Sequence, residues 1–417
     1  MSVVAARHTS SAAQLRPSPG SEWLSSAERQ TLTPELIVER CHALTPVLAA
    51  HAEDAERARR PVDSVWNAIR RTGLFHLLVP RRFGGLAANP DAFIDAIIPL
   101  AEGCASTAWV ASFCVEHNWL LAQFPERAQK EIFGQFPFII APAVTVPPGV
   151  ATRADDGITI NAHWKWGSGV MHADWVIGNV LIEGEDRPSL AMVVFPITQA
   201  RVIDTWNMTG MSGTGSHDIV AENIFIPSHR MASIGPIAEG RGIASHLYPE
   251  PVYKATMLPF LAMSAAIPAI GAARGAVNWF RNYLGGHAKA GSDTKQKEKP
   301  TSQIRLSRAD IAVRSAETIL RNAARQNLTL HDLAGPEQIR ERIRLRAEIA
   351  FAVRLCRESV QTICSSGGSS IYAHNNPLQR CLQDLNVIAS HIAFDDDVAN
   401  ELHGRVMLDL PPNSKLI

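Results

Sequence analysis

Apolar residues recur at helical spacing along the first third of the chain. Thr33 followed by Pro34 is typical of a helix start. A threonine side chain can cap the first turn, and the N–H that proline lacks has no partner within the helix at the first position. A second helix is predicted from Asp63, and further helix over residues 91–121. The predicted N-terminal organisation is a disordered tail over residues 1–30 followed by a helical domain over residues 31–135.

Between residues 136 and 235 the pattern changes to short β-branched and aromatic runs separated by proline and glycine. The clearest runs are Trp175–Ile182, Leu190–Phe195 and Ile219–Ile226. These residues are therefore predicted to form a β middle domain.

Helical spacing returns after residue 245 and predicts a C-terminal helical bundle over residues 245–417. Its long segments are roughly 255–285, 303–330, 336–366 and 377–404. Residues 287–303 are rich in lysine, glycine, serine and threonine, which is typical of a mobile loop. The uncharged stretch Ala255–Ala273 contains two prolines and is only weakly apolar, so we interpret it as a buried bundle helix and not as a membrane span.

The composition is that of a globular protein. The 417 residues include 40 basic and 40 acidic side chains, 46% of residues are hydrophobic and 19% are charged. This balance lacks the basic excess of a nucleic-acid-binding protein. The six cysteines form no C-x-x-C pair, so neither a zinc ribbon nor a disulfide framework is indicated, and a reducing cytoplasm is the expected location.

The first candidate for chemistry lies in the segment Asn161–Ile182. If this segment is a strand, Trp164, Trp166 and Ser168 lie on one face, and Gly169 allows close backbone approach. Two aromatic side chains beside a hydroxyl suit a planar heterocycle such as a flavin. Two core tryptophans and a turn serine are the alternative, and these residues alone leave both interpretations open.

The second candidate is a helical stripe that contains Trp109, Phe113 and His117 at positions i, i+4 and i+8. An imidazole can accept a proton at neutral pH, as activation of a phenol or an amine requires. The helix alone is also compatible with a hydrogen-bonded histidine in the core.

A third candidate is His391, which lies four residues before Asp395 in the last long helical segment. On one continuous helix this carboxylate would fix the tautomer of the imidazole. The adjacent acids Asp395–Asp397 lack ligand spacing, so no metal site is predicted.

Two further patterns are assigned to structure. The glycines of GMSGTG, residues 210–215, lie between strands with no P-loop lysine, which favours a β turn. Arginines at 340, 342, 344 and 346 alternate along a helix, which is typical of a solvated or subunit-facing surface.

Four separated segments resemble the acyl-CoA dehydrogenase superfamily in order and spacing. They are Leu78-Val79-Pro80 with Gly84-Gly85, WKWGSGVMHADW, GMSGTGSHDIVAENIFIP and GGSSIYAHNNPLQR. The resemblance covers about residues 34–400. It implies an α+β fold with a helical N-terminal domain, a β-barrel-like middle domain and a C-terminal four-helix bundle, assembled as a homotetramer.

Within that superfamily the sequence favours one branch. Dehydrogenases commonly carry a catalytic glutamate shortly after the glycine pair Gly367-Gly368, where this chain has His374, Asn375 and Asn376. The sequence resembles the oxygenase components of two-component flavin monooxygenases that act on 4-hydroxyphenylacetate and steroid-derived phenols. The resemblance lies in the helix with STAWV and HNW, the HADW strand, the GTGSHD turn and the ASxH segment.

That resemblance implies roles for particular residues of this chain. His117 and His391 correspond to the catalytic pair, with Phe113 beside them in the substrate pocket, and Ser168 corresponds to a residue that contacts the reactive part of the flavin. The implied flavin-binding residues are Trp109, Trp166, Ser168, Gly169, Gly367 and Gly368.

The chain also departs from the superfamily pattern. Gln383-Asp384 replaces a common Arg-Asp pair, and residues 287–303 replace a segment that grips FAD in dehydrogenases. We therefore expect reversible uptake of reduced FMN or FAD, supplied by a separate NAD(P)H-dependent flavin reductase. No nucleic-acid or membrane partner is expected.

The resulting hypothesis is an oxygenase component that hydroxylates a phenolic or indolic substrate with reduced flavin and dioxygen through a flavin hydroperoxide. An N- or S-oxygenase acting on an amino sugar or a thiophene, an acyl-CoA dehydrogenase, and an inactive scaffold remain alternatives.

Overall fold

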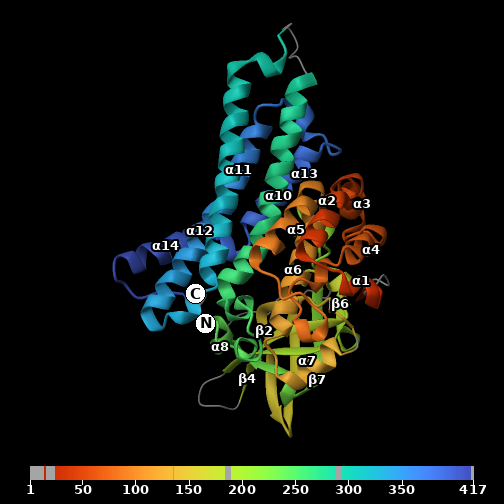
Figure 1. Cartoon of the computed structure of the whole chain (residues 1–417), viewed down its shortest axis with the longest axis vertical. Helices are drawn as coiled ribbons and strands as arrows, with labels where there is room; N and C mark the ends of the chain where they lie inside the picture. Colours follow the sequence, from red (N-terminus) through yellow and green to blue (C-terminus); the bar gives the residue numbers. More distant parts are fainter. Residues whose placement is uncertain (1–13, 16–23, 135, 184–188, 287–293, 415–417) are drawn as a thin grey trace, which may run out of the picture.

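The computed structural model describes residues 14–15, 24–134, 136–183, 189–286 and 294–414. Apart from the short strand β1 (Gln14–Leu15), the strands of the β-sheet lie in sequence between an N-terminal and a C-terminal group of helices (Figure 1). In space, α10 and α11 form a long antiparallel pair, the N-terminal helices lie along one side of it, and the sheet lies beyond one end.

The N-terminal helices follow the sequence signals closely. The side chain of Thr33 accepts a hydrogen bond from the backbone N–H of Leu36 and caps the second helix, and Gly73 ends the fourth in a left-handed conformation. The helices are α1 (Ser26–Gln30), α2 (Pro34–Ala50), α3 (Ala52–Ala58), α4 (Asp63–Thr72), α5 (Pro90–Gly103), α6 (Ala105–Leu121) and α7 (Glu126–Phe133).

Two N-terminal predictions need correction. Residues 26–30 of the expected disordered tail form helix α1, which begins with a capping box between Ser25 and Glu28 and follows the buried Leu24. The rest of that tail, apart from the short strand β1 and residues 24–25, lies outside the described residues. The helix predicted over residues 91–121 is two helices, since Cys104 has an extended backbone.

In the described part of the chain, eight strands form a single sheet in the order β1-β6-β7-β3-β2-β4-β5-β8. The pairing is antiparallel except between β2 and β4. The strands are β1 (Gln14–Leu15), β2 (Ala143–Ala154), β3 (Gly157–Trp164), β4 (Trp175–Ile182), β5 (Ser189–Pro196), β6 (Arg201–Ile203), β7 (Asp218–Pro227) and β8 (Met231–Ser233).

The sheet has a core of its own around the fully buried indole of Trp164. This ring stacks on Phe195 at 6.1 Å between centroids, and its Nε1 donates to the carbonyl oxygen of Asn179 at 3.0 Å. Gly178 on β4 makes room for the indole, because a Cβ there would lie 2.5 Å from it. Trp164 is therefore a core residue of the β module.

The C-terminal bundle is built from α10 (Met257–Gly286), α11 (Pro300–Asn327), α12 (Gly335–Cys364), α13 (Pro377–Ala389) and α14 (Asp396–Met407). The short helices α8 (Ile234–Ala238) and α9 (Ile243–Leu247) lead into it. Part of the predicted mobile loop is helical, since α11 begins at Pro300, and residues 287–293 of that loop lie outside the described residues.

Helix α10 is long and apolar enough to cross a membrane by length and composition, but 83% of its most apolar window is buried inside the structure. It packs against α5, α6, α11, α12 and α13. The interpretation of residues 255–273 as a buried bundle helix is confirmed.

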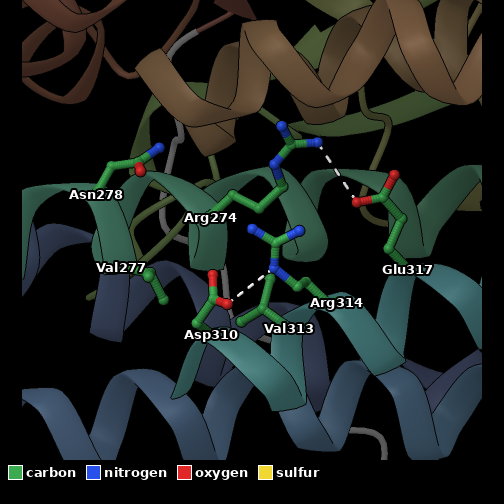
Figure 2. A pocket seen from close by; sticks show the side chains of 7 residues that line it. All are labelled: Arg274, Val277, Asn278, Asp310, Val313, Arg314 and Glu317. Atoms are coloured by element: carbon green, nitrogen blue, oxygen red, sulfur yellow. Dashed lines mark hydrogen bonds and ion pairs between the residues drawn. The ribbon is translucent and has the colours of Figure 1, made fainter. Parts of the chain in front are cut away.

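Ion pairs join α10 and α11 to the N-terminal helices. A hollow between α10 and α11 contains the pairs Arg274–Glu317 at 3.4 Å and Arg314–Asp310 at 2.8 Å (Figure 2). Arg274 also lies 3.2 Å from Glu102 on α5. Because these charged side chains are paired with one another, the hollow is a region of ion-pair contacts between α10 and α11.

The 210–215 turn joins the β module to the bundle. The backbone N–H of Met211 donates to the buried Asp384 on α13 at 2.5 Å, and burial raises the pKa of this carboxyl to about 7. A Cβ at Gly210 would lie 2.2 Å from the carbonyl oxygen of Gln383. The predicted turn is therefore a close backbone contact between the two modules.

Gly210→Ala should lower the free energy of unfolding by about 1–3 kcal/mol, because the added methyl group collides with backbone that cannot rotate away. Chemical denaturation measures this change. In the control Gly404→Ala on α14 the added Cβ meets nothing within 4 Å, so stability should be unchanged or slightly higher. Equal stability of the Gly210 variant and the wild type would contradict the close contact.

Candidate active site

The predicted aromatic stripe of α6 is assembled as expected. The rings of Trp109 and Phe113 are 4.7 Å apart between centroids, and Phe113 meets His117 edge-on at 5.5 Å. Trp109 and His117 are buried, whereas Phe113 is half-buried. The stripe therefore presents a continuous apolar wall with one imidazole at its end.

The tautomer of His117 is set by its surroundings. Its Nδ1 lies 2.5 Å from the backbone carbonyl oxygen of Ala141, which can only accept, so this nitrogen carries the proton. Burial lowers the pKa of His117 to about 4. At neutral pH the imidazole is uncharged, and its Nε2 lone pair is the free acceptor.

His391, from the C-terminal part of the chain, lies beside the same aromatic stripe of α6. Its ring lies 5.6 Å from Trp109 and 6.5 Å from Phe113 between centroids, and the half-buried Phe113 thus contacts both imidazoles. Burial, with the nearby charge of Arg346, lowers the pKa of His391 to about 4. Two uncharged imidazoles from distant segments therefore converge on one aromatic wall.

The expected pairing of His391 with Asp395 is wrong. The predicted helix is broken between α13 and α14, and His391 caps a short 3₁₀ turn by accepting from the backbone N–H of Ala393 at 3.3 Å. Asp395 instead caps α14 by accepting from Val398 at 3.0 Å. The break removes the i, i+4 geometry that the prediction assumed.

The turn that carries His391 is held by a buried arginine. Arg346 on α12 donates to the carbonyl oxygen of Ile392 at 2.9 Å and to that of Ala393 at 3.3 Å. Arg342 and Arg346 are 6% and 1% exposed, so these two arginines do not belong to the predicted solvated or subunit-facing surface. Arg342 and Arg346 are four residues apart, so they lie on the same face of α12, and this face is directed into the protein.

Ser168 links the β module to α6. Its hydroxyl accepts a hydrogen bond from the indole Nε1 of Trp109 at 3.1 Å and lies 2.9 Å from the hydroxyl of Ser216. The Ser216 hydroxyl is in turn 2.9 Å from that of Thr214. Ser168 is half-buried, whereas Ser216 and Thr214 are buried.

The predicted common face of Trp164 and Trp166 does not exist. Strand β3 ends at Trp164, and Trp166, two residues later, has a left-handed conformation with φ of 63° and is 61% exposed. Such a backbone is strained for a bulky residue. Trp164 lies in the core of the β module, and Trp166 stands on the surface two residues before Ser168.

The glycines assigned to the flavin have different surroundings. Gly169 is buried, and a Cβ there would lie 3.0 Å from Cys114 Sγ, so this glycine allows the β module to approach α6. Gly367 accepts a hydrogen bond from Tyr283, which lies roughly 28 Å along α10 from Ser264, a residue that packs against α6. The structure does not bring Gly367 and Gly368 into the aromatic cluster.

Sequence reasoning missed a buried acid beside His117. Glu116 is 1% exposed and accepts from the hydroxyl of Ser264 on α10 at 2.7 Å, and Ser112 donates to the backbone of Ser264 at 2.7 Å. Burial raises the pKa of Glu116 to about 8, so the group is protonated at neutral pH. The signal available in the sequence was the i, i+4 spacing of Ser112 and Glu116 on a mostly apolar helix, which places two polar side chains on one face.

Comparisons with known proteins find relatives over most of this chain. The model of the family described as acyl-CoA dehydrogenase, C-terminal domain, matches residues 263–396. A pigment production hydroxylase from Rhodococcus sp. is 32% identical over 384 residues, which cover 91% of this chain and 98% of that protein. The oxygenase component of an FADH2-dependent resorcinol hydroxylase from Rhizobium sp. is 30% identical over 91% of this chain and 95% of that protein.

A solved structure has the same fold. XiaF from Streptomyces sp., in complex with FADH2 and glycerol, superimposes with a TM-score of 0.84 at 28% identity, covering 93% of this chain and 98% of that chain. The order of helices, β module and helical bundle is that of the acyl-CoA dehydrogenase fold. Within it, this chain belongs to the family of flavin-dependent oxygenase components.

The protonated state of Glu116 predicts a pH-dependent stability difference. The pKa of Glu116 is about 8 in the folded protein and about 4.5 in the unfolded chain. Its contribution to the free energy of unfolding is therefore complete below pH 4.5 and is lost as pH rises through 8. Glu116→Gln cannot ionise and should therefore gain stability relative to the wild type between pH 5 and 8. Urea unfolding across that range measures the difference, and a constant difference would refute the assignment. Glu401→Gln, on an exposed helix surface, is the matched control.

Burial is the main cause of the low pKa of His391 and the charge of Arg346 is the second, so Arg346→Met should raise this pKa above about 4 while leaving it below its ordinary value. NMR titration of the imidazole protons, assigned with His391→Asn, measures this shift. Arg346→Lys keeps the charge and should keep the pKa low. An unchanged titration in folded Arg346→Met would show that the guanidinium charge does not act on His391.

Proposed function

We propose that this protein is the oxygenase component of a two-component monooxygenase that hydroxylates an aromatic substrate bearing a phenolic O–H or an indolic N–H. The observation that carries the proposal is the convergence of His117 and His391 on Trp109 and Phe113, beside the hydroxyl of Ser168.

The residues present fit a flavin. The exposed indole of Trp166 and the half-buried Ser168 hydroxyl offer a flat apolar surface next to a hydrogen-bonding group, as a planar heterocycle needs. Trp109 would line the ring, and Gly169 would let the turn approach it. A bound reduced flavin supplies the activation of dioxygen and the transfer of one oxygen atom.

His117 would act on the substrate through Nε2. Because Nδ1 is committed to Ala141, the free lone pair can accept a hydrogen bond from a phenol or an indole and draw its proton away from the ring. The removal of that proton makes the aromatic ring more electron-rich. His391, uncharged and aimed at the same wall, would orient the substrate.

Water exclusion is the second task of these side chains. Trp109, Phe113 and Phe394 enclose the imidazoles, and Phe394 lies 5.8 Å from His391 between ring centroids. An apolar enclosure limits the unproductive release of hydrogen peroxide from activated oxygen.

The assembly and partners are further parts of the proposal. A separate reductase, dependent on NAD(P)H, would supply reduced FMN or FAD in the cytoplasm. Association into a homotetramer is supported by exposed apolar side chains on the outer helices of the bundle, namely Ile304, Ile311 and Phe351. The glycines Gly367 and Gly368, remote from the aromatic cluster, would contact a more distant part of the cofactor.

His117→Asn should reduce hydroxylated product by about 10²-fold to 10⁴-fold in rate, because Nε2 no longer accepts the substrate proton. Hydrogen peroxide should still form when reduced flavin and air are supplied. Product and peroxide are measured together with phenolic and indolic substrates such as resorcinol and indole. The exposed His246→Asn is the control and should behave as the wild type. An undiminished product yield in the His117 variant would exclude this role.

A further inference from the structure

Two polar residues of the HNW and HADW motifs have no part in the proposed function. Asn118 follows His117 in the first motif, and Asp174 is the acid of the second. Asn118 is buried and Asp174 is half-buried. Both side chains make hydrogen bonds to one short segment of backbone, residues 139–142. This segment includes Ala141, whose carbonyl oxygen sets the tautomer of His117.

Helix α6 holds one edge of the 139–142 segment. The side-chain amide of Asn118 accepts from the backbone N–H of Ile139 at 3.0 Å and donates to the carbonyl oxygen of the same residue at 3.0 Å. Its Nδ2 also donates to the carbonyl oxygen of Cys114 at 2.7 Å, so the orientation of the amide is fixed by backbone groups with known roles. An amide that both donates to and accepts from one residue fixes the register of the segment against α6.

The carbonyl oxygen that meets His117 lies two residues after the one that meets Asn118. In an extended chain, residues i and i+2 direct their backbone groups to the same side. A proline at position 142 favours an extended backbone at Ala141, because the residue before a proline is restricted to that region. Ile139 and Ala141 therefore both direct their carbonyl oxygens towards α6.

The β module holds the opposite edge of the 139–142 segment. The N–H of Ile140 donates to a carboxyl oxygen of Asp174 at 3.0 Å, and its carbonyl oxygen accepts from the backbone N–H of Asp174 at 2.7 Å. The N–H of Ile177 on β4 donates to the carbonyl oxygen of Pro142 at 2.9 Å. Alternate residues are thus bonded to α6 and to the β module, so the segment cannot slide along α6 without losing bonds on both sides.

We propose that Asn118 and Asp174 are positioning residues for the proton acceptor of the reaction. They hold the 139–142 segment in register, and its Ala141 carbonyl oxygen then keeps the proton of His117 on Nδ1. The inference rests on the proposed function, in which Nε2 accepts the substrate proton. If the carbonyl oxygen moved away, the proton could shift to Nε2, and the imidazole would present a donor where the reaction needs an acceptor.

The first measurement is the tautomer of His117, which long-range proton–nitrogen NMR correlations report and which His117→Asn assigns. The wild type at neutral pH should show the Nδ1–H form alone. Asn118→Leu removes both bonds to Ile139, so the Nε2–H form should become detectable. Asp174→Ala removes the acceptor for the N–H of Ile140 and should act in the same direction. Asp174→Asn keeps an acceptor oxygen and should behave as the wild type.

The second measurement is the yield of hydroxylated product and of hydrogen peroxide per reduced flavin oxidised. Asn118→Leu should lower the rate of product formation about tenfold, the effect of about one hydrogen bond, and raise the share of peroxide. Asn327→Leu is the matched control. The buried Asn327 also accepts from the N–H and donates to the carbonyl oxygen of one residue, Thr256, at 3.1 Å each. This control should lose comparable stability but keep the tautomer and the product share.

The outcomes separate this inference from the proposed function. A shift in the tautomer for Asn118→Leu and Asp174→Ala, but not for Asp174→Asn or Asn327→Leu, would support the inference. A single Nδ1–H form in either folded variant, or a mixture of forms in the wild type, would overturn it. If Asn118→Leu does not fold, the comparison of Asp174→Ala with Asp174→Asn decides. A wild type that forms no hydroxylated product would overturn the proposed function, whereas the tautomer measurements would still test the two positioning residues.

Discussion

The structure depends on the burial of α6 on nearly every side. One face is held by α10 through Glu116 and Ser264, and another by the chain segment that includes Ala141 through His117. The same face as that of His117 meets the β module through Trp109 and Ser168. Because each contact is a hydrogen bond in a dry environment, the rotation of the helix is fixed, and with it the direction of every side chain on the aromatic wall.

This constraint also explains the charge states at the site. A protein interior that excludes water disfavours charged groups, so the two imidazoles are neutral and the carboxyl of Glu116 is protonated. The positive charge of Arg346 is accommodated because its guanidinium donates to the carbonyl oxygens of the turn between α13 and α14. Desolvation is thus the common cause of the uncharged state of these three groups.

Much of the fold was readable from the sequence because local signals agreed with one another. Thr33 and Asp63 mark helix starts in both the prediction and the structure, and the strand Trp175–Ile182 has the predicted bounds. The α6 stripe was also readable, since helical spacing alone places Trp109, Phe113 and His117 together. The convergence of His391 came from family resemblance, because no local pattern reports a contact across more than half of the chain.

The errors arose where a periodic pattern was extended past the end of its element. The alternation of a strand was assumed to continue from Trp164 to Trp166, although β3 ends at Trp164. Helical spacing was assumed from His391 to Asp395, although the helix is broken there. Alternating arginines were taken as a surface, although a helix turns Arg342 and Arg346 to the same inward face. The hydroxyls of Thr214 and Ser216 carry no periodic signal, since they lie in an irregular turn.

The origin of the site from three separate parts of the chain has a consequence for folding. The wall comes from α6, the hydroxyl from the turn after β3, and the second imidazole from the break before α14. Loop-closure entropy opposes such distant contacts until the modules dock. In a nascent or partly folded chain the aromatic wall, the hydroxyl and the second imidazole therefore lie apart, and the site is assembled only when the modules dock.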